Sequence, residues 1–249
     1  MIQNNRSRKI LERDYSIWSR QSGISWRYQI PKAWLVWEWL FSGNGNDTSG
    51  NGNNLTLVDA PTYQTAWTGY FSQEWNFNGS SDYATLASNS SIEFTNAFSY
   101  SIIWKWSDTD AMVLAKRPSW NPVEFSVYLG GTADFRVIQW VSAWWSNAFA
   151  MWWAGDFNTL QDWWYHTLSF SHQFWTTNSA WYLDWKPISL TWTLQTNANA
   201  SSTNTLYIGK NWPTSNSFPQ WVLGVRLWNR VLSPKEHMDI HLHNLRLAH

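Results

Sequence analysis

The chain has 249 residues, 17 basic and 17 acidic side chains, 24 tryptophans, 12 glycines and no cysteine. The absence of cysteine excludes a disulfide framework, a thiolate nucleophile and a zinc site built on sulfur. No run of about 20 apolar residues is present, which excludes a membrane-spanning helix, and the length is sufficient to bury a core. The unusual feature is that tryptophan outnumbers glycine, since average chains contain about 7% glycine.

Basic charge is concentrated at the start of the chain. Residues 1–33 contain seven Lys/Arg and two Asp/Glu, whereas residues 34–249 contain ten and fifteen, so the net charges are +5 and −5. We interpret residues 1–33 as a basic arm or linker that could attach the following domain to a larger assembly. The charge of this arm is too low to predict binding of nucleic acid, and the arm lacks interleaved motif residues. The first residues also lack the apolar stretch of a signal peptide.

From residue 34 onward, short apolar stretches are separated by Asn/Ser/Gly/Asp clusters every ~8–12 residues, which is typical of a sandwich or barrel. At the start of residues 98–105, apolar residues alternate with serines, which is typical of a half-buried strand. Residues 42–54 are too polar to form an element and predict a loop. The predicted strands are residues 35–41, 74–77, 83–86, 98–105, 123–129, 135–138, 166–171, 180–183, 205–208 and 222–228.

A single helix is predicted at the end of the chain. Ser233 is a suitable N-cap, Pro234 suits the first helical position, and Glu236 completes a capping box. His237 and His241 are four residues apart, a spacing that can hold a metal, but no H-E-x-x-H motif accompanies them. We therefore expect these two histidines to lie on a solvated helix face.

Five segments carry a resemblance to a known family. They are LVWEWLFSGNGNDTSGNGNN, FSQEWNFNGSSDYATL, YLDWKPI, LYIGKNW and VRLWNRVLSPKE, and they occur in that order between residues 34 and 245. The chain thereby resembles laminin-G-like, concanavalin A-type lectin domains. The resemblance implies that residues 34–249 form an all-β jelly-roll β-sandwich of two antiparallel sheets with a short C-terminal helix, usually binding glycans or protein surfaces.

The same resemblance suggests an origin for the tryptophan excess. The family has glycine where this chain has Trp34, Trp37, Trp185, Trp212 and Trp221. At Asp184-Trp185, a two-residue hairpin loop requires positive φ, which glycine adopts easily and tryptophan resists. The tandem pairs at 144–145, 152–153 and 163–164 also lie in turn-like contexts. We hypothesise that many of these tryptophans are glycine in the organism, through a lineage that reads UGA as glycine; the other interpretation is an unusual aromatic surface.

Two tryptophans match aromatic positions of the family and are expected to be genuine, Trp39 and Trp228. Trp75 and Trp104 cannot be assigned to either group. If most of the others are glycine, the remaining candidates for stacking on a sugar are Tyr128, Tyr165 and Tyr182, each of which could equally belong to the core.

Catalytic motifs are absent from the sequence. A glycoside hydrolase needs two carboxylates across the scissile bond, but no glutamate of a predicted strand has an acidic partner two residues away, and Asp108 and Asp110 lie in a predicted loop. No G-x-S-x-G motif supports a serine hydrolase. We therefore predict that the chain is not an enzyme, and that Arg226 and Arg230 pair with structural carboxylates or carbonyls.

The chemical site that the sequence suggests is a calcium site in the polar loop. Calcium prefers six to eight oxygen ligands, and Asn46, Asp47 and Asn51 supply side-chain oxygens within a few residues. Related jelly rolls often hold an ion here, assisted by an acid before the last strand; residues 221–225 contain none. The alternative is a turn loop that hydrogen-bonds to itself.

The sequence as a whole predicts a non-enzymatic module for recognition of a glycan or surface protein, outside the cell or on a cell or particle surface. One alternative is a structural or receptor-binding component of a surface appendage or phage particle, attached through residues 1–33. A glycoside hydrolase of the same fold is the third. Neither nucleic acid nor membrane insertion is expected.

Overall fold

The structure is a computed structural model in which fourteen segments can be described. They are residues 28–41, 43–59, 61–64, 74–78, 81–105, 111–116, 125–129, 135–140, 148–153, 165–173, 176, 179–188, 204–210 and 221–248.

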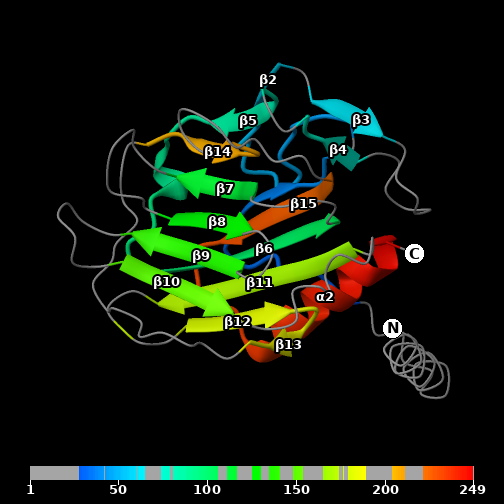
Figure 1. Cartoon of the computed structure of the whole chain (residues 1–249). Helices are drawn as coiled ribbons and strands as arrows, with labels where there is room; N and C mark the ends of the chain where they lie inside the picture. Colours follow the sequence, from blue (N-terminus) through cyan, green and yellow to red (C-terminus); the bar gives the residue numbers. More distant parts are fainter. Residues whose placement is uncertain are drawn as a thin grey trace.

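The described strands form two antiparallel sheets that pack face to face (Figure 1). Sheet A has the order β13 (Lys186–Pro187), β12 (Ser179–Leu183), β11 (Tyr165–Gln173), β6 (Ala97–Lys105), β15 (Trp221–Trp228), β4 (Glu74–Asn76) and β3 (Thr62–Gln64), with β1 (Leu35–Trp39) also paired to β15. Sheet B has the order β10 (Ala148–Trp153), β9 (Phe135–Trp140), β8 (Phe125–Leu129), β7 (Ala111–Lys116), β14 (Leu206–Ile208), β5 (Tyr83–Leu86) and β2 (Thr56–Val58). The prediction of an all-β sandwich with a short C-terminal helix is confirmed.

Alternate residues of the facing strands fill the space between the sheets. On β6 these include Phe98, Tyr100 and Ile102, and sheet B contributes Leu114 and Ile208, all of them buried. Because successive strand residues point to opposite faces, the intervening residues of β6 point away from this core.

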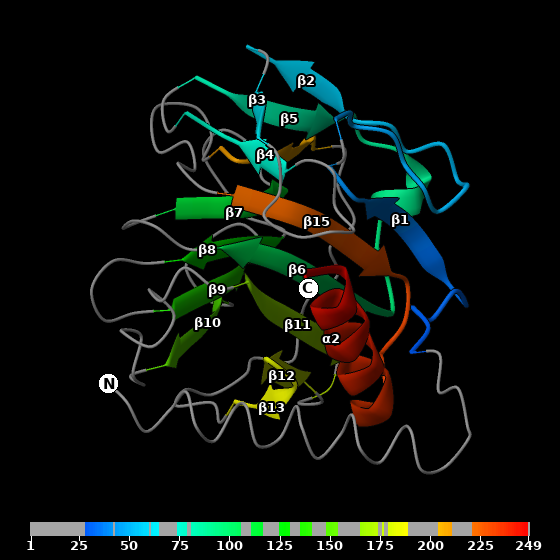
Figure 2. The same ribbon diagram turned by 90° about the vertical axis from the view of Figure 1, so that its right-hand side faces the viewer.

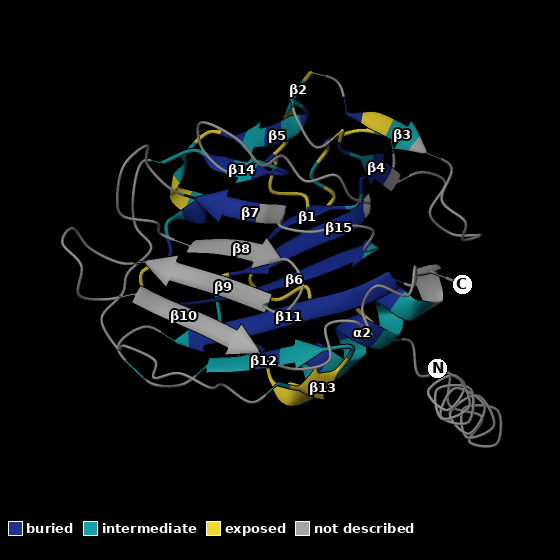
Figure 3. Ribbon diagram, in the orientation of Figure 1, coloured by how far each residue is buried: buried dark blue, intermediate teal, exposed yellow. Residues whose placement is uncertain are grey.

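The outer face of the central strands β6 and β11 of sheet A is also buried, which corrects the expectation of a half-buried strand at residues 98–105. Helix α2 (Pro234–Ala248) lies across β11 and β6 on that face (Figure 2). The segment before α2 covers Ser99, whose Oγ donates to the Arg230 carbonyl at 2.6 Å and accepts from the Leu232 N–H at 3.1 Å. Ser99 and Ser101 are as inaccessible as the core residues, and both faces of β6 and β11 are buried (Figure 3). The burial pattern of a strand therefore depends on a segment more than 130 residues later in the chain.

The predicted capping box at the start of α2 is confirmed. The backbone N–H of Glu236 donates to Ser233 Oγ at 3.3 Å, and the Ser233 N–H donates to the Glu236 carboxylate at 2.9 Å. Arg230 also pairs with this carboxylate, as predicted for a structural arginine. No helix among the described segments is long and apolar enough to cross a membrane.

Residues 28–33, which the sequence assigns to the basic arm, contact the sandwich. Ile30 is buried in a small cluster with Trp228 and Ile240, and the Trp228 indole N–H donates to the Pro31 carbonyl at 2.7 Å. Residues 1–27 lie outside the described segments.

Several short strands were not predicted, namely β2, β3, β7, β10 and β13, together with the 3₁₀ turn η1 (Ser90–Ile92). The pair Trp152–Trp153 belongs to the end of β10 rather than to a turn, which corrects that expectation. The other two tandem pairs, Trp212, Asp108 and Asp110 lie outside the described segments.

Candidate functional site

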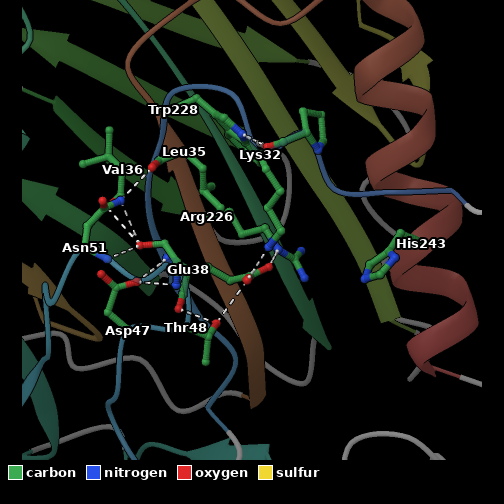
Figure 4. A network of polar contacts seen from close by, with 12 residues as sticks. Lys32, Leu35, Val36, Glu38, Asp47, Thr48, Asn51, Arg226, Trp228 and His243 are labelled. Carbon is green, nitrogen blue, oxygen red and sulfur yellow. Dashed lines mark hydrogen bonds and ion pairs between the residues drawn. The ribbon is translucent and has the colours of Figure 1, made fainter.

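The predicted calcium loop follows β1, and its one carboxylate is turned toward backbone amides. Asp47 Oδ1 accepts from the N–H groups of Glu38 at 3.0 Å and Ser49 at 2.9 Å, and Oδ2 accepts from the Asn53 N–H at 2.9 Å. Hydrogen bonds of this kind are strong because the acceptor is charged. Asp47 therefore ties the loop to β1 and to itself (Figure 4).

The other two predicted ligands make hydrogen bonds through their N–H groups. The Asn51 amide N–H₂ donates to the carbonyls of Leu35 at 2.8 Å and Val36 at 2.9 Å, and the exposed Asn46 donates its backbone N–H to Asn44. No group of three acidic or histidine side chains suited to a metal occurs in the described parts of the chain. These contacts fit a self-bonded turn loop better than a cage of oxygens, and calcium here stays a prediction.

A buried ion pair lies beside this loop. Arg226 Nε donates to Glu38 Oε1 at 2.7 Å, Lys32 Nζ donates to Oε2 at 3.0 Å, and Arg226 Nη1 donates to Asn244 of α2 at 2.8 Å (Figure 4). Burial alone would raise the pKa of Glu38, but the Arg226 and Lys32 charges lower that pKa to about 2. Glu38 is thus a permanently ionised structural group, and the predicted structural role of Arg226 is confirmed.

The interface between α2 and sheet A contains a serine–histidine contact. His237 Nδ1 lies 2.8 Å from Ser169 Oγ, and its Nε2 lies 2.8 Å from Ser171 Oγ. Burial lowers the pKa of His237 to about 4, so this imidazole is neutral at pH 7. Both ring nitrogens contact serines, so Nδ1 lacks the carboxylate that orients the histidine of a serine hydrolase. The contact fastens the helix to the sheet.

His241 is buried in the same interface. It is 3% exposed and His237 is 0% exposed, so the expected solvated helix face is wrong for both histidines. The physical reason is that the outer face of sheet A is itself polar, and polar helix residues can satisfy it. His241 Nδ1 lies 3.8 Å from Asp184, whose carboxylate also contacts His166 Nδ1 at 2.7 Å. Burial would raise the Asp184 pKa, but these histidines and a backbone N–H hold it at about 2.

The hairpin between β12 and β13 has the two-residue loop that the sequence predicts. Leu183 pairs with Lys186, and φ is +49° at Asp184 and +64° at Trp185. Positive φ at both central residues is the arrangement for which Asp-Gly is preferred. The side chain of Trp185 is 42% exposed and borders a groove of about 380 Å³ between this hairpin and α2.

An aromatic pair lies on the outer face of sheet B. Tyr83 on β5 and Tyr207 on β14 have ring centroids 6.1 Å apart at an angle of 42°, and Lys210 Nζ lies 4.0 Å from the centroid of the Tyr83 ring. All three side chains are partly exposed, whereas the adjacent Ala84 and Ile208 point into the core. This pair was not predicted from the sequence, although the strict alternation of YATL and LYI indicates two outward tyrosines.

The tyrosines that the sequence did single out have other positions. Tyr165 is buried in a small cluster with Ile103 and Leu223. Tyr182 is partly exposed, but its ring stacks on His237 at 4.3 Å. The side chain of Tyr128 lies outside the described part of the structure.

No protein-family model and no curated protein sequence matches this chain. Solved structures do match its fold. One is domain 4 of AbnA, a GH43 extracellular arabinanase from Geobacillus stearothermophilus, in complex with arabinotriose. It is 15% identical with a TM-score of 0.64, and the match covers 83% of this chain and 98% of that chain.

Botulinum neurotoxin structures also match. One is neurotoxin type C, from work on its interaction with two ganglioside molecules, at 11% identity and a TM-score of 0.64, covering 85% of this chain and 51% of that chain. Another is the binding domain of neurotoxin DC in complex with rat synaptotagmin II, at 11% identity and a TM-score of 0.63. That match covers 86% of this chain and 52% of that chain. This chain spans about half the length of these toxin chains. The likeness shows a β-sandwich that occurs in carbohydrate- and receptor-binding domains.

Proposed function

We propose that this chain is a non-enzymatic recognition module whose ligand is a carbohydrate or a carbohydrate-bearing surface. The observation that carries the proposal is the likeness to domain 4 of AbnA, because the match covers 98% of a domain solved with a bound trisaccharide. The toxin structures support the coarser statement that this sandwich serves binding, with glycan and protein partners.

The contacts of three described acidic side chains also favour binding over hydrolysis. A glycoside hydrolase requires two carboxyl groups about 5–9 Å apart across a cleft. Glu38 is held by Arg226, Asp184 by His166, and Asp47 by backbone amides. These carboxylates are committed to structural contacts, so we expect no release of reducing sugar from any glycan that the chain binds.

This function would place the module outside a cell or on the surface of a cell or particle, as the laminin-G-like resemblance implies. The matching alternative is a receptor-binding component of a surface appendage or phage particle. In that case residues 1–33 attach it to an assembly. Removal of residues 1–27, which keeps the contacts of Ile30, Pro31 and Lys32 with the sandwich, should abolish incorporation and leave glycan binding unchanged.

The function is tested by a glycan array with the full chain, followed by isothermal titration with each positive glycan. We expect saturable binding with one site per chain and no hydrolysis of the bound glycan. Absence of binding to every glycan, combined with binding to a protein receptor, would contradict the carbohydrate proposal. Release of reducing sugar would contradict the non-enzymatic one.

We also infer that glycine occupies positions 34 and 185 in the organism. Both residues have positive φ, +62° at Trp34 and +64° at Trp185, and both side chains are exposed. UGA codons at these positions would support the inference, and UGG codons would contradict it.

Two tryptophans have the contacts expected of genuine ones. The Trp39 indole N–H donates to the Asn53 carbonyl at 2.8 Å, and that of Trp228 donates to Pro31. Both side chains are 0% exposed. Buried indoles usually have such a partner, so we expect UGG codons at these two positions.

A further inference from the structure

We propose that the outer face of sheet B, at β5 and β14, binds an acidic saccharide, with its sugar ring on Tyr207 and its carboxylate on Lys210. This inference rests on the proposed function and adds a place on the fold and a chemical class of ligand. Neither residue is a tryptophan, so the site does not depend on which tryptophans are genuine.

The ring of Tyr207 offers a surface on which a sugar can stack. Tyr207 points away from the core because its neighbours Leu206 and Ile208 fill it. Aromatic rings gain from contact with apolar faces and keep a polar hydroxyl for hydrogen bonding. Tyr83 lies beside it at 6.1 Å, so the two tyrosines form one continuous patch, here called the Tyr83–Tyr207 platform.

Hydroxyl groups extend the platform toward the edge of the sheet. In the strand register Tyr207 pairs with Thr85, and Thr85 pairs with Thr56 on β2. Paired residues of adjacent strands share a face, and strands lie about 4.8 Å apart, so this row is about 10 Å long. Thr56 is exposed and Thr85 is partly exposed. A short saccharide on Tyr207 would therefore find hydroxyl partners along one row.

Lys210 gives the platform its preference for an acid. Its ammonium lies over the Tyr83 ring at 4.0 Å, a cation–π contact that holds it at the edge of the platform. Lys32 and Lys235 pair with Glu38 and Asp239, but Lys210 forms no ion pair with any described carboxylate. An ammonium group next to an aromatic ring is complementary to a carboxylate attached to a sugar ring.

The role of Tyr83 differs from that of Tyr207. The Lys210 ammonium lies over the Tyr83 ring. This tyrosine therefore acts as a positioning residue for the lysine. Replacement of Tyr83 by leucine should therefore weaken the preference for acidic sugars more than it weakens stacking of a neutral sugar.

The test measures binding of matched acidic and neutral probes to the full chain by isothermal titration. The pairs are sialyllactose against lactose, and oligogalacturonate against its methyl ester. We expect at least one acidic probe to bind roughly tenfold more tightly than its neutral partner, since one charge-assisted hydrogen bond is worth about that factor. Raising the salt concentration should reduce the difference.

Variants then separate the two residues. Lys210→Gln should remove the acid preference and Lys210→Arg should keep it, while Lys186→Gln, at an exposed lysine of sheet A, should change nothing. Tyr207→Ala should lose binding of both probes, and Tyr207→Phe should retain most of it. If Tyr207→Ala does not fold, the lysine variants and Tyr207→Phe still decide the question.

Two negative results have different meanings. Equal binding of the acidic and neutral probes, or an acid preference that Lys210→Gln leaves unchanged, overturns the acidic-saccharide site but leaves the recognition function intact. Binding of no saccharide on a broad array overturns the proposed function and this site with it.

Discussion

Replacing Trp185 by glycine and, separately, by alanine isolates the effect of its backbone conformation. Both changes remove the same indole, which is 42% exposed, so the lost packing is common to the two variants. They differ because φ is +64° at this position. The left-handed region destabilises an L-residue by about 1–2 kcal/mol relative to glycine. The larger chain entropy of glycine in the unfolded state offsets about 0.5–1 kcal/mol of this advantage.

The glycine variant should therefore be more stable than the alanine variant by about 0.5–1 kcal/mol. With a urea m-value of about 3 kcal/mol per molar, this is a difference of about 0.2–0.3 M in the midpoint of unfolding. The same comparison at Trp34, with φ of +62°, should give the same sign.

Thr85 provides the matched control, because it lies in strand β5 and its side chain is also partly exposed. There alanine should be more stable than glycine by about 0.5–1 kcal/mol, which is the opposite sign. If glycine is no better than alanine at either Trp185 or Trp34, the inference that these positions require glycine is refuted.

The other predictions concern the polar contacts of sheet A and the loop. The folded-state pKa of His237, about 4, lies below the unfolded value of 6.5, so the free energy of unfolding decreases as pH falls below 6.5. The loss is about 2 kcal/mol at pH 5. His237→Gln should therefore reduce the shift in urea midpoint between pH 7 and pH 5. Arg226→Met should cost about 3–5 kcal/mol, because it removes the buried partner of Glu38 and leaves only the exposed Lys32 beside that carboxylate. Adding Glu38→Gln should recover most of this loss. A loss below about 1 kcal/mol in the single variant would contradict the structural ion pair. Asp47→Ala should cost at least about 2 kcal/mol through its lost backbone hydrogen bonds, equally in EDTA and in calcium, whereas a loss confined to calcium would show an ion site.

Local patterns predicted much of the fold. The strand at Tyr83–Leu86 and the capping box at Ser233 each depend on a few neighbouring residues, and both predictions are confirmed. Short strands such as β7 were missed, since AMVLAK shows no regular alternation. The burial of Ser99 could not be predicted because Ser99 is covered by Arg230 and Leu232, far along the chain.

The candidate site was less predictable for the same reason. Asp47 is an obvious oxygen ligand in the sequence, but its partners include the N–H of Glu38, nine residues earlier and in another element. His237 and His241 were predicted to be solvated, because the spacing of residues along a helix gives no information about the strand that faces it. That strand carries serines, which contact His237. The Tyr83–Tyr207 platform exists only because β5 and β14, more than 100 residues apart in the chain, are neighbours in sheet B.

The central claim, that the sandwich recognises a carbohydrate without hydrolysing it, is tested most directly by isothermal titration of the full chain with the glycans that a broad array selects, combined with product analysis of the same mixtures. The account predicts saturable binding and recovery of intact glycan. Hydrolysis of the bound glycan, or no binding to any glycan by protein shown to be folded, would contradict it.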